Sequence, residues 1–126
     1  MTTSEIATVL AWHDALNAGD IDTLLALSSD DIELGGPEGA SQGLSALREW
    51  AATAGVTLIP KRMYVYEGVV VAEEEATWAT APGDTRIVAS AFRVVHDQVT
   101  STFRHETLES ALAATDLTEK DLVSDT

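Results

Sequence analysis

The chain of 126 residues contains no cysteine, and its cationic side chains number seven against 21 acidic ones. The absence of cysteine excludes disulfide bonds and thiolate-bound metals. A formal net charge of -14 argues against nucleic acids and anionic membranes as partners, because phosphate groups are held by clustered Lys and Arg. Apolar runs such as Val69–Ala72 are too short to span a bilayer, and the N-terminal segment lacks the basic start of a secretory signal. We therefore expect a cytoplasmic protein.

The length and composition predict one globular domain over residues 1–126. Hydrophobic residues make up 45% and charged residues 22% of the chain, which is typical of folded rather than disordered proteins. No linker rich in Pro, Gly or Ser divides the sequence, and no internal repeat is visible. One hydrophobic core is enough for a chain of this size.

The first part of the chain has apolar residues at helical spacing. Thr2 and Glu5 have capping-box spacing before a predicted amphipathic helix, which stops at Asn17-Ala18-Gly19. Asp20 predicts the N-cap of a short second helix, and "LSALREWAATAG" predicts a third. Between the last two, "DDIELGG" predicts a short strand and "EGASQG" a loop.

From Val56 onward the pattern is extended. Four segments rich in β-branched and aromatic residues predict antiparallel strands: "VTLIPKRMYVYEG", "VVVAEEEATWAT", "TRIVASAFRVV" and "VTSTFRHE". Turns are expected at Glu67-Gly68, Pro82-Gly83-Asp84 and His96-Asp97-Gln98. Pro60 cannot donate to a ladder, so it marks an edge, a bulge or the beginning of pairing.

The C-terminal segment "TLESALAATDLTEKDL" is expected to be helical, with Thr118 and Asp121 spaced as a second cap. The order of elements predicts an α+β domain in which helices cover one face of a curved antiparallel sheet. Its other face must then be solvated or shared, so we expect a homodimer formed through the outer sheet face.

This order of elements resembles the nuclear transport factor 2 superfamily of cone-shaped α+β folds. The resemblance lies in "ALNAGDIDTLLALSSDDIEL", which joins two helices to a strand, then "QGLSALREW", then "VTSTFRHE" as the last strand. The superfamily includes ketosteroid isomerases, limonene epoxide hydrolases, scytalone dehydratase and SnoaL-type polyketide cyclases. It implies a cone-shaped, curved antiparallel sheet with N-terminal helices over its concave face and a ligand between them. The family shares the cone and differs in what lines it.

Carrying over the isomerase site shows two departures. The position of the isomerase aspartate base falls on Gly36, which has no side chain, and that of the helix-one tyrosine falls on Trp12. The resemblance therefore does not imply isomerase chemistry.

Carrying over the epoxide hydrolase site leaves a carboxylate and an imidazole. The last-strand aspartate position falls on His105, within "FRHE", and the first middle-strand aspartate falls on Glu74. The arginine position of that middle strand falls on Ala72, so Arg93 on the neighbouring strand is a candidate substitute.

The consecutive glutamates 73–75 lie in a predicted strand, where successive side chains face opposite sides. The face that carries Glu74 is more apolar than the face of Glu73 and Glu75, so Glu74 is predicted to point inward. A buried carboxylate must be paired or neutral. Alternation also places Phe103 and His105 on the inward face of the last strand. Glu74 and His105 are therefore the candidate catalytic acid/base pair.

Structural alternatives stand beside each of these assignments. Glu74 can lie at a rim in contact with solvent, and His105 can simply bond a backbone carbonyl. His13 lies on the apolar stripe of the first helix, where a hydrogen-bonded core histidine is expected. The aromatic residues can all be core.

The sequence thus predicts a cone that binds a small, largely apolar, neutral molecule, with hydrolase, isomerase or cyclase chemistry as the catalytic option. The expected walls and ligand-binding residues are Trp12, Trp50, Trp78, Phe103, Tyr64 and Arg93. No cofactor is expected, since no nucleotide or flavin motif is present, and no metal, since no His, Asp and Glu cluster has ligand spacing. The alternative is a noncatalytic interaction module whose cone is filled by its own side chains. The volume of the cavity separates the two.

Overall fold

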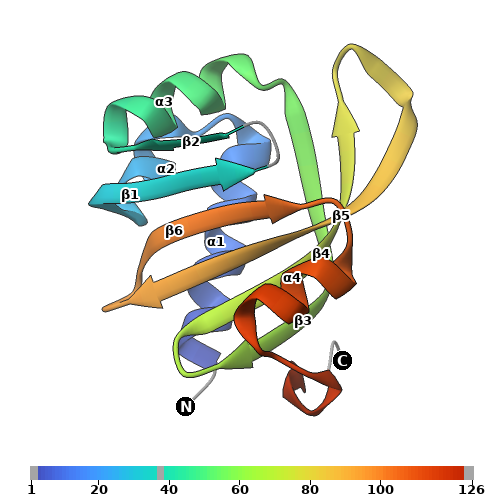
Figure 1. Cartoon of the computed structure of the whole chain (residues 1–126). Helices are drawn as coiled ribbons and strands as arrows, with labels where there is room; N and C mark the ends of the chain where they lie inside the picture. Colours follow the sequence, from blue (N-terminus) through green and yellow to red (C-terminus); the bar gives the residue numbers. More distant parts are fainter. Residues whose placement is uncertain (1–2, 37–38, 124–126) are drawn as a thin grey trace.

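The computed structural model describes residues 3–36 and 39–123. In these residues an open, seven-stranded sheet is combined with helices (Figure 1). The elements follow in the order α1 (Thr3–Ala18), α2 (Ile21–Ala26), β1 (Ser28–Gly36), β2 (Gly39–Gln42), α3 (Leu44–Thr53), β3 (Val56–Tyr66), β4 (Val69–Trp78), β5 (Ala81–Val95), β6 (Gln98–His105), α4 (Leu108–Thr115), the 3-10 helix η1 (Glu119–Asp121) and β7 (Leu122–Val123). No helix in the described ranges is long and apolar enough to cross a membrane.

The sheet has the strand order β2-β1-β6-β5-β4-β3-β7. Its neighbours are antiparallel except for β1 and β6, which run parallel, so the sheet is mixed. The α+β class and the helices on the concave face are confirmed, and α1 lies across that face (Figure 1).

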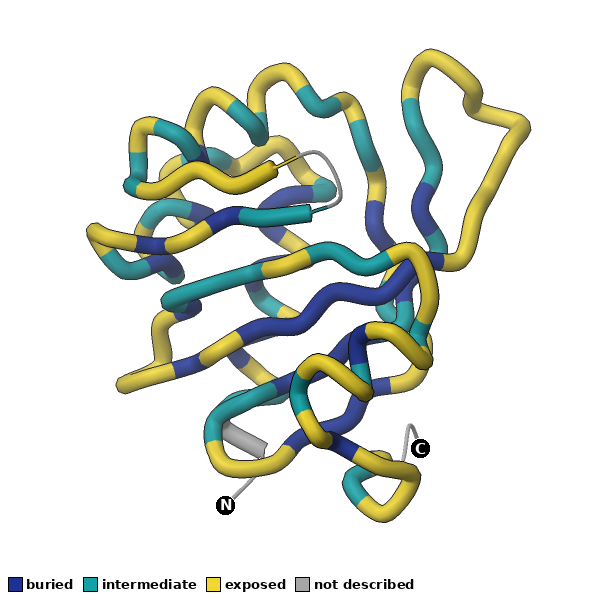
Figure 2. The backbone as a smooth tube through the Cα atoms, in the orientation of Figure 1, coloured by how far each residue is buried: buried dark blue, intermediate teal, exposed yellow. Residues whose placement is uncertain are grey.

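The core has two parts, one on each face of the sheet. The larger part joins α1, α2 and α3 to the inward side chains of the strands, among them Trp12, Leu47 and Phe92. The smaller part lies under α4 and the residues after it, where Ala111 packs with strand residues such as Val71. Buried residues are therefore concentrated in the middle of β4 and β5, which are covered from both sides (Figure 2).

The helix α4 corrects one expectation, because it covers part of the outer face that the sequence left bare. The C-terminal helix is also shorter than expected. Asp116 has a left-handed backbone (φ 61°) that ends α4, and the chain continues through η1 into β7, which pairs with β3. The expected cap is present: Thr118 and Asp121 form a capping box at η1.

Two further local predictions are wrong. Residues Gly39–Gln42, within the expected loop, form β2, an exposed edge strand that pairs with β1 through its backbone and has no apolar pattern to show it. The turn between β4 and β5 lies at Ala79 and Thr80, and Pro82–Asp84 belong to the exposed start of β5. The predicted turns after β3 and β5 are confirmed, as is the irregularity near Pro60. Thr2, the proposed first cap, lies outside the described residues.

Candidate functional site

A bulge in β6 decides which of its side chains face the cavity. Val94 of β5 pairs with Val99, but the preceding residue, Arg93, pairs with Ser101, so Thr100 is an extra residue on β6. The Thr100 hydroxyl donates to the Arg93 carbonyl at 3.3 Å. An extra residue reverses the alternation of the strand beyond it. The side chains that follow Thr100 therefore point opposite to the faces that strict alternation predicts.

This reversal places His105 away from Glu74. Arg104 is the partner of Ser90 and shares its concave face, whereas His105 pairs with Ala89 on the outer face. The His105 Nδ1 atom lies 3.1 Å from the Ser110 hydroxyl, at the start of α4. The expected convergence of Glu74 and His105 is wrong, because the bulge interrupts the strict alternation of side chains along β6.

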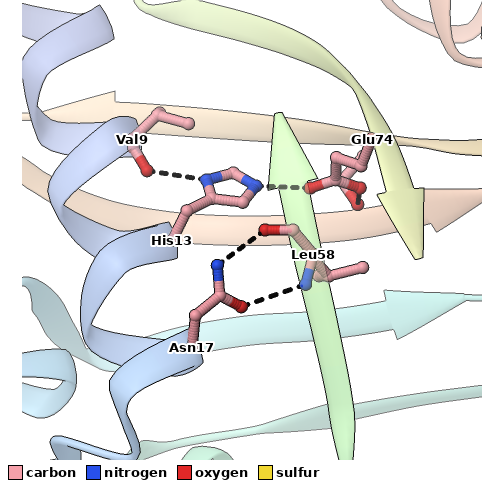
Figure 3. A network of polar contacts seen from close by, with 6 residues as sticks. Val9, His13, Asn17, Leu58 and Glu74 are labelled. Carbon is pink, nitrogen blue, oxygen red and sulfur yellow. Dashed lines mark hydrogen bonds and ion pairs between the residues drawn. The ribbon is translucent and has the colours of Figure 1, made fainter. Parts of the chain in front are cut away.

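Glu74 does point inward, and its side chain has no exposed surface. One carboxylate oxygen lies 2.5 Å from the Nε2 atom of His13, and the other accepts a hydrogen bond from the Ser90 hydroxyl at 2.7 Å. Figure 3 shows His13 on α1 facing Glu74 on β4. The alternative of a solvated Glu74 is therefore excluded, and His13 is the core histidine that the helical stripe predicted.

The contacts of His13 fix the number of protons in the pair. Its Nδ1 atom lies 2.7 Å from the Val9 carbonyl oxygen, which can only accept, so Nδ1 carries a proton. The contact between Nε2 and Glu74 needs one proton, on either atom. The two groups together thus carry no net charge, whether as imidazolium and carboxylate or as imidazole and carboxylic acid. This accounts for their tolerance of full burial.

The sequence of α1 sets the position of the histidine. Val9 and His13 are four residues apart and Asn17 follows by four more, so all three lie on one side of the helix. The Asn17 amide donates to the Leu58 carbonyl at 2.8 Å and accepts from the Leu58 N–H at 3.0 Å (Figure 3). These two hydrogen bonds between the Asn17 side chain and the Leu58 backbone fix α1 on β3. They thereby also hold the His13 imidazole opposite β4.

A cavity of about 160 Å³ lies between the helices and the concave face. The Trp12 and Trp50 rings stack in its wall, with centroids 6.2 Å apart and planes 21° apart. The Trp12 indole N–H donates to Ser28 at 3.1 Å, which fixes that ring. The described lining residues are Trp12, Leu34, Gly35, Gly36, Gly39, Ser41, Trp50, Val56, Leu58, Ser90, Thr102 and Arg104.

Ser90 connects the cavity with the buried pair. Its side chain lines the cavity and also donates to Glu74, which does not itself line the cavity. The carboxylate thus lies one side chain behind the wall. A chain of hydrogen bonds runs from Ser90 through Glu74 to His13, and ends at a backbone carbonyl of α1.

Beyond the cavity, a more open groove of about 930 Å³ borders the start of β5. Trp50, Val56 and Arg104 line both the cavity and the groove. The Arg104 guanidinium lies 5.8 Å from the centroid of the Trp78 ring, within the range of a cation–π contact. Arg104 therefore stands where the two spaces meet.

The other predicted ligand-binding residues are divided between the two faces. Trp12 and Trp50 line the cavity, and Trp78 lines the groove. Phe103 and Arg93 are exposed and lie on the outer face, with the Phe103 ring against Gly35. These two do not line the cavity.

Tyr64 is also on the outer face, buried under the C-terminal segment. Its hydroxyl donates to Glu119 at 3.2 Å. Burial raises the pKa of the Tyr64 hydroxyl, and the negative charge of Glu119 adds to this effect. The contacts of Tyr64 are those of a packing residue.

Ser90, Thr102 and Arg104 line the cavity but were not predicted from the sequence as site residues. Ser90 faces the cavity because β5 pairs with β4 in a register that sets Ser90 opposite Ala72, on the face of Glu74. Gly36, at the position of the isomerase base, lines the cavity without a side chain. Within the described residues, no three His, Asp or Glu side chains are grouped to hold a metal ion.

Comparison with known proteins gives the family. Residues 9–107 match the SnoaL-like domain. The chain belongs to the SnoaL-like domain family. No curated protein matches the chain.

The family model confirms the expected resemblance to SnoaL-type proteins, and three solved structures illustrate the shared fold. An NTF2-like protein of unknown function from Cytophaga hutchinsonii has 14% identity and a TM-score of 0.74, with 84% of this chain and 92% of that chain covered. A proposed polyketide cyclase from Sinorhizobium meliloti has 16% identity and a TM-score of 0.72, with 79% and 94% covered. A proposed ketosteroid isomerase from Kribbella flavida has 15% identity and a TM-score of 0.73, with 82% and 77% covered. Because the identities are this low, the likeness to these three proteins shows a shared fold alone.

Proposed function

We propose that this SnoaL-like domain binds a compact, largely apolar ring molecule in the cavity beside Trp12 and Trp50, and moves a proton on it through Ser90. The observation that carries the proposal is the position of Ser90, which lines the cavity and bonds Glu74. The volume of about 160 Å³ resembles that of an engineered cavity of roughly 150 Å³ that holds benzene. It supports a ligand with one ring in the cavity, whose substituents extend into the groove.

The proposed proton transfer uses groups of the chain alone. Ser90 donates its proton to Glu74, so its oxygen can accept a proton from a ligand in the cavity. The pair of Glu74 and His13 already holds one proton between its members. A proton accepted by Ser90 can pass to Glu74 as the hydroxyl proton is released, and the reverse order returns it. General acid/base catalysis needs such a group within hydrogen-bond reach of the reacting atom.

The first experiment tests binding with benzyl alcohol, a neutral single ring with one hydroxyl group. Backbone amide shifts in NMR should move on the concave side, at Leu34, Leu58 and Thr102, which line the cavity. Amides at Val71 and Ala91, on the outer face, should stay unchanged. Shifts that are absent at millimolar concentration, or that spread evenly over both faces, would contradict the proposed binding.

The second experiment tests proton transfer with cyclohexanone, whose α-protons exchange slowly in D2O. We expect the wild-type chain to accelerate this exchange, and Ser90→Ala to reduce the acceleration by about 10²-fold, the contribution of one general acid/base group. Thr115→Ala is the control, because the Thr115 hydroxyl bonds a backbone carbonyl of α4 and Thr115 does not line the cavity. Equal exchange rates with and without the protein would contradict the catalytic part of the proposal.

A second candidate is binding without conversion, and one observation favours it. Both carboxylate oxygens of Glu74 are occupied, by His13 and Ser90, and the residue has no exposed surface. If benzyl alcohol binds in the cavity and cyclohexanone exchange is not accelerated, the noncatalytic function is the better one. The cavity of about 160 Å³ argues against the version of this candidate in which the cone is filled by side chains.

We also propose that two copies associate through the outer sheet face. There α4 covers Val71 and Ala91, but Ile59, Ile87 and Phe103 remain exposed on strands at either side. Exposed apolar side chains on a sheet face support an interface between copies. Native mass spectrometry of the freshly purified chain should show the dimer and any retained small molecule together, and a clean monomer would contradict the association.

A further inference from the structure

Three hydroxyl side chains of the described residues line the cavity, and they differ in their hydrogen bonds. Ser90 is buried and donates to Glu74. Ser41 and Thr102 line the same cavity, and neither hydroxyl has a hydrogen-bond partner among the residues that the structure describes. Ser41 is exposed on the edge strand β2, where water can bond it, whereas Thr102 is half-buried. Thr102 is therefore the lining hydroxyl that is best placed to bond a ligand.

The strand register directs Thr102 into the cavity. On β6 it pairs with Phe92 of β5 and with Leu34 of β1 (Figure 1). Paired residues of neighbouring strands share one face of the sheet. The Phe92 ring packs against Trp12, with centroids 5.4 Å apart, and Leu34 lines the cavity. Thr102 thus lies on the concave face, among apolar neighbours.

These surroundings make the Thr102 hydroxyl selective. A ligand that fills the cavity separates this hydroxyl from solvent. The loss of its bonds to water costs free energy unless the ligand replaces them. A hydroxyl can both donate and accept, so a hydroxyl or carbonyl oxygen of the ligand can serve as the new partner. A site of this kind discriminates against analogues that lack the polar group.

The positions of Thr102 and Ser90 favour two separate oxygen atoms on the ligand. Ser90 lies two residues before Phe92, the partner of Thr102, so Ser90 and Thr102 are diagonal neighbours on one face. Diagonal neighbours of paired strands are about 7 Å apart. One oxygen atom that bonds two hydroxyls at about 2.8 Å each spans at most about 5.6 Å. A ligand that bonds both side chains is therefore expected to carry two oxygen substituents.

From this arrangement we infer that Thr102 selects ring compounds that carry two hydrogen-bonding oxygen substituents. Ser90 bonds one oxygen and Thr102 bonds the other. The second bond fixes the rotation of the ring in the cavity, so the same ring position always faces Ser90. The inference rests on the proposed binding function and names its ligand class. It does not depend on whether the ligand is converted.

The test compares resorcinol with m-cresol, which share a ring and one hydroxyl. The second substituent is a hydroxyl in resorcinol and a methyl group of similar size in m-cresol. Dissociation constants are measured at pH 7 by NMR titration of the full chain. Thr102→Val keeps the shape of the side chain and should weaken resorcinol about fivefold, as expected for one hydrogen bond. It should leave m-cresol within about twofold, because m-cresol can place its single hydroxyl at Ser90.

Two further variants separate recognition from changes in shape or fold. Thr102→Ser keeps the hydroxyl and should retain most of the affinity for resorcinol. Thr57→Val is the matched control, because it makes the same chemical change at an exposed residue of β3 that does not line the cavity. Both of its dissociation constants should equal those of the wild type. Melting temperatures of all variants identify a loss of fold.

The outcomes distinguish this inference from the binding function itself. If m-cresol binds the wild type but folded Thr102→Val weakens both probes equally, or neither, the inference is overturned and the cavity remains a binding site. If Thr102→Ser loses resorcinol as Thr102→Val does, or if Thr57→Val weakens resorcinol to the same extent, the Thr102 hydroxyl is not the group that selects the ligand. If neither probe binds the wild type, both the binding function and the inference are overturned.

Discussion

The imidazole of His13 and the carboxylate of Glu74 face each other across the core, with Nε2 and Oε2 2.5 Å apart. Both side chains are almost wholly buried, at 1% and 0% exposure. Because the Val9 carbonyl requires a proton on Nδ1, the contact between the two side chains holds one further proton. The pair therefore contributes no net charge to the interior. This allows a fold with a net charge of -14 to keep one carboxylate in its core.

The first prediction separates the shape of the Glu74 side chain from its charge. Glu74→Gln should destabilise the chain by less than about 1.5 kcal/mol, because the amide nitrogen can donate to a neutral His13 and the amide oxygen can accept from Ser90. Glu74→Leu leaves the Ser90 hydroxyl and the Nε2 atom of His13 buried without their shared partner, and should cost about 3 to 5 kcal/mol. Urea unfolding at pH 7 gives both values.

The matched control for this prediction is Glu75→Gln, on the same strand. Glu75 faces outward and lies 3.3 Å from Lys61, in an exposed ion pair. The loss of this ion pair should change the free energy of unfolding by about 0 to 1 kcal/mol. If Glu74→Gln proves as costly as Glu74→Leu, the pair depends on ionisation rather than on its hydrogen bonds.

A second prediction concerns the coupling of the pair. His13→Leu and Glu74→Leu should each be strongly destabilising, since each leaves the other group buried and unpaired. In the double variant neither His13 nor Glu74 is left buried without the other. The loss in free energy of unfolding should therefore be smaller than the sum of the two single losses by about 1 to 3 kcal/mol. A double-mutant cycle in urea measures this difference. Additive losses would show that the contact contributes no coupling energy.

Local patterns predicted most of the fold. Helical spacing indicated α1, α2 and α3, and the extended pattern indicated β3 to β6. The strands β2 and β7 were missed because they are short and pair through the backbone, which leaves no alternation in the sequence. The place of α4 on the outer face was missed for a similar reason, since a helical pattern does not state which side of the sheet the helix will cover.

The candidate site was less predictable than the fold, because its contacts join distant segments. Alternation along β4 gave the inward direction of Glu74, and the helical stripe gave the burial of His13. Their contact spans 61 residues and depends on where α1 crosses the sheet, which the Asn17 bonds to Leu58 determine. The bulge at Thr100 has no signal in the residue types around it, and it moved His105 and Phe103 to the outer face.

The third prediction concerns the contact between Gly35 and Phe103. A Cβ atom added at Gly35 would lie 2.4 Å from two carbons of the Phe103 ring. Gly35→Ala should therefore destabilise the chain by about 1 to 3 kcal/mol, since the half-exposed ring must move. Phe103→Leu in the Gly35→Ala background should recover part of the loss, because the smaller side chain leaves room. Thermal unfolding of Gly35→Ala, of the double variant and of Phe103→Leu alone tests this. If Phe103→Leu restores none of the stability lost in Gly35→Ala, the Phe103 ring is not the obstacle.

The fourth prediction is a loss of stability at alkaline pH that depends on Tyr64. Burial raises the pKa of its hydroxyl above the usual value of 10.0, so the folded chain holds this proton more tightly than the unfolded chain does. The stabilisation is complete below the unfolded pKa and is lost as the pH rises through the folded pKa. The free energy of unfolding should therefore fall above pH 10, and the fall should be smaller in Tyr64→Phe. The control is Tyr66→Phe, because Tyr66 is 55% exposed and should leave the pH dependence unchanged. Urea unfolding from pH 8 to 11 measures all three chains, and parallel curves for the wild type and Tyr64→Phe would contradict the assignment.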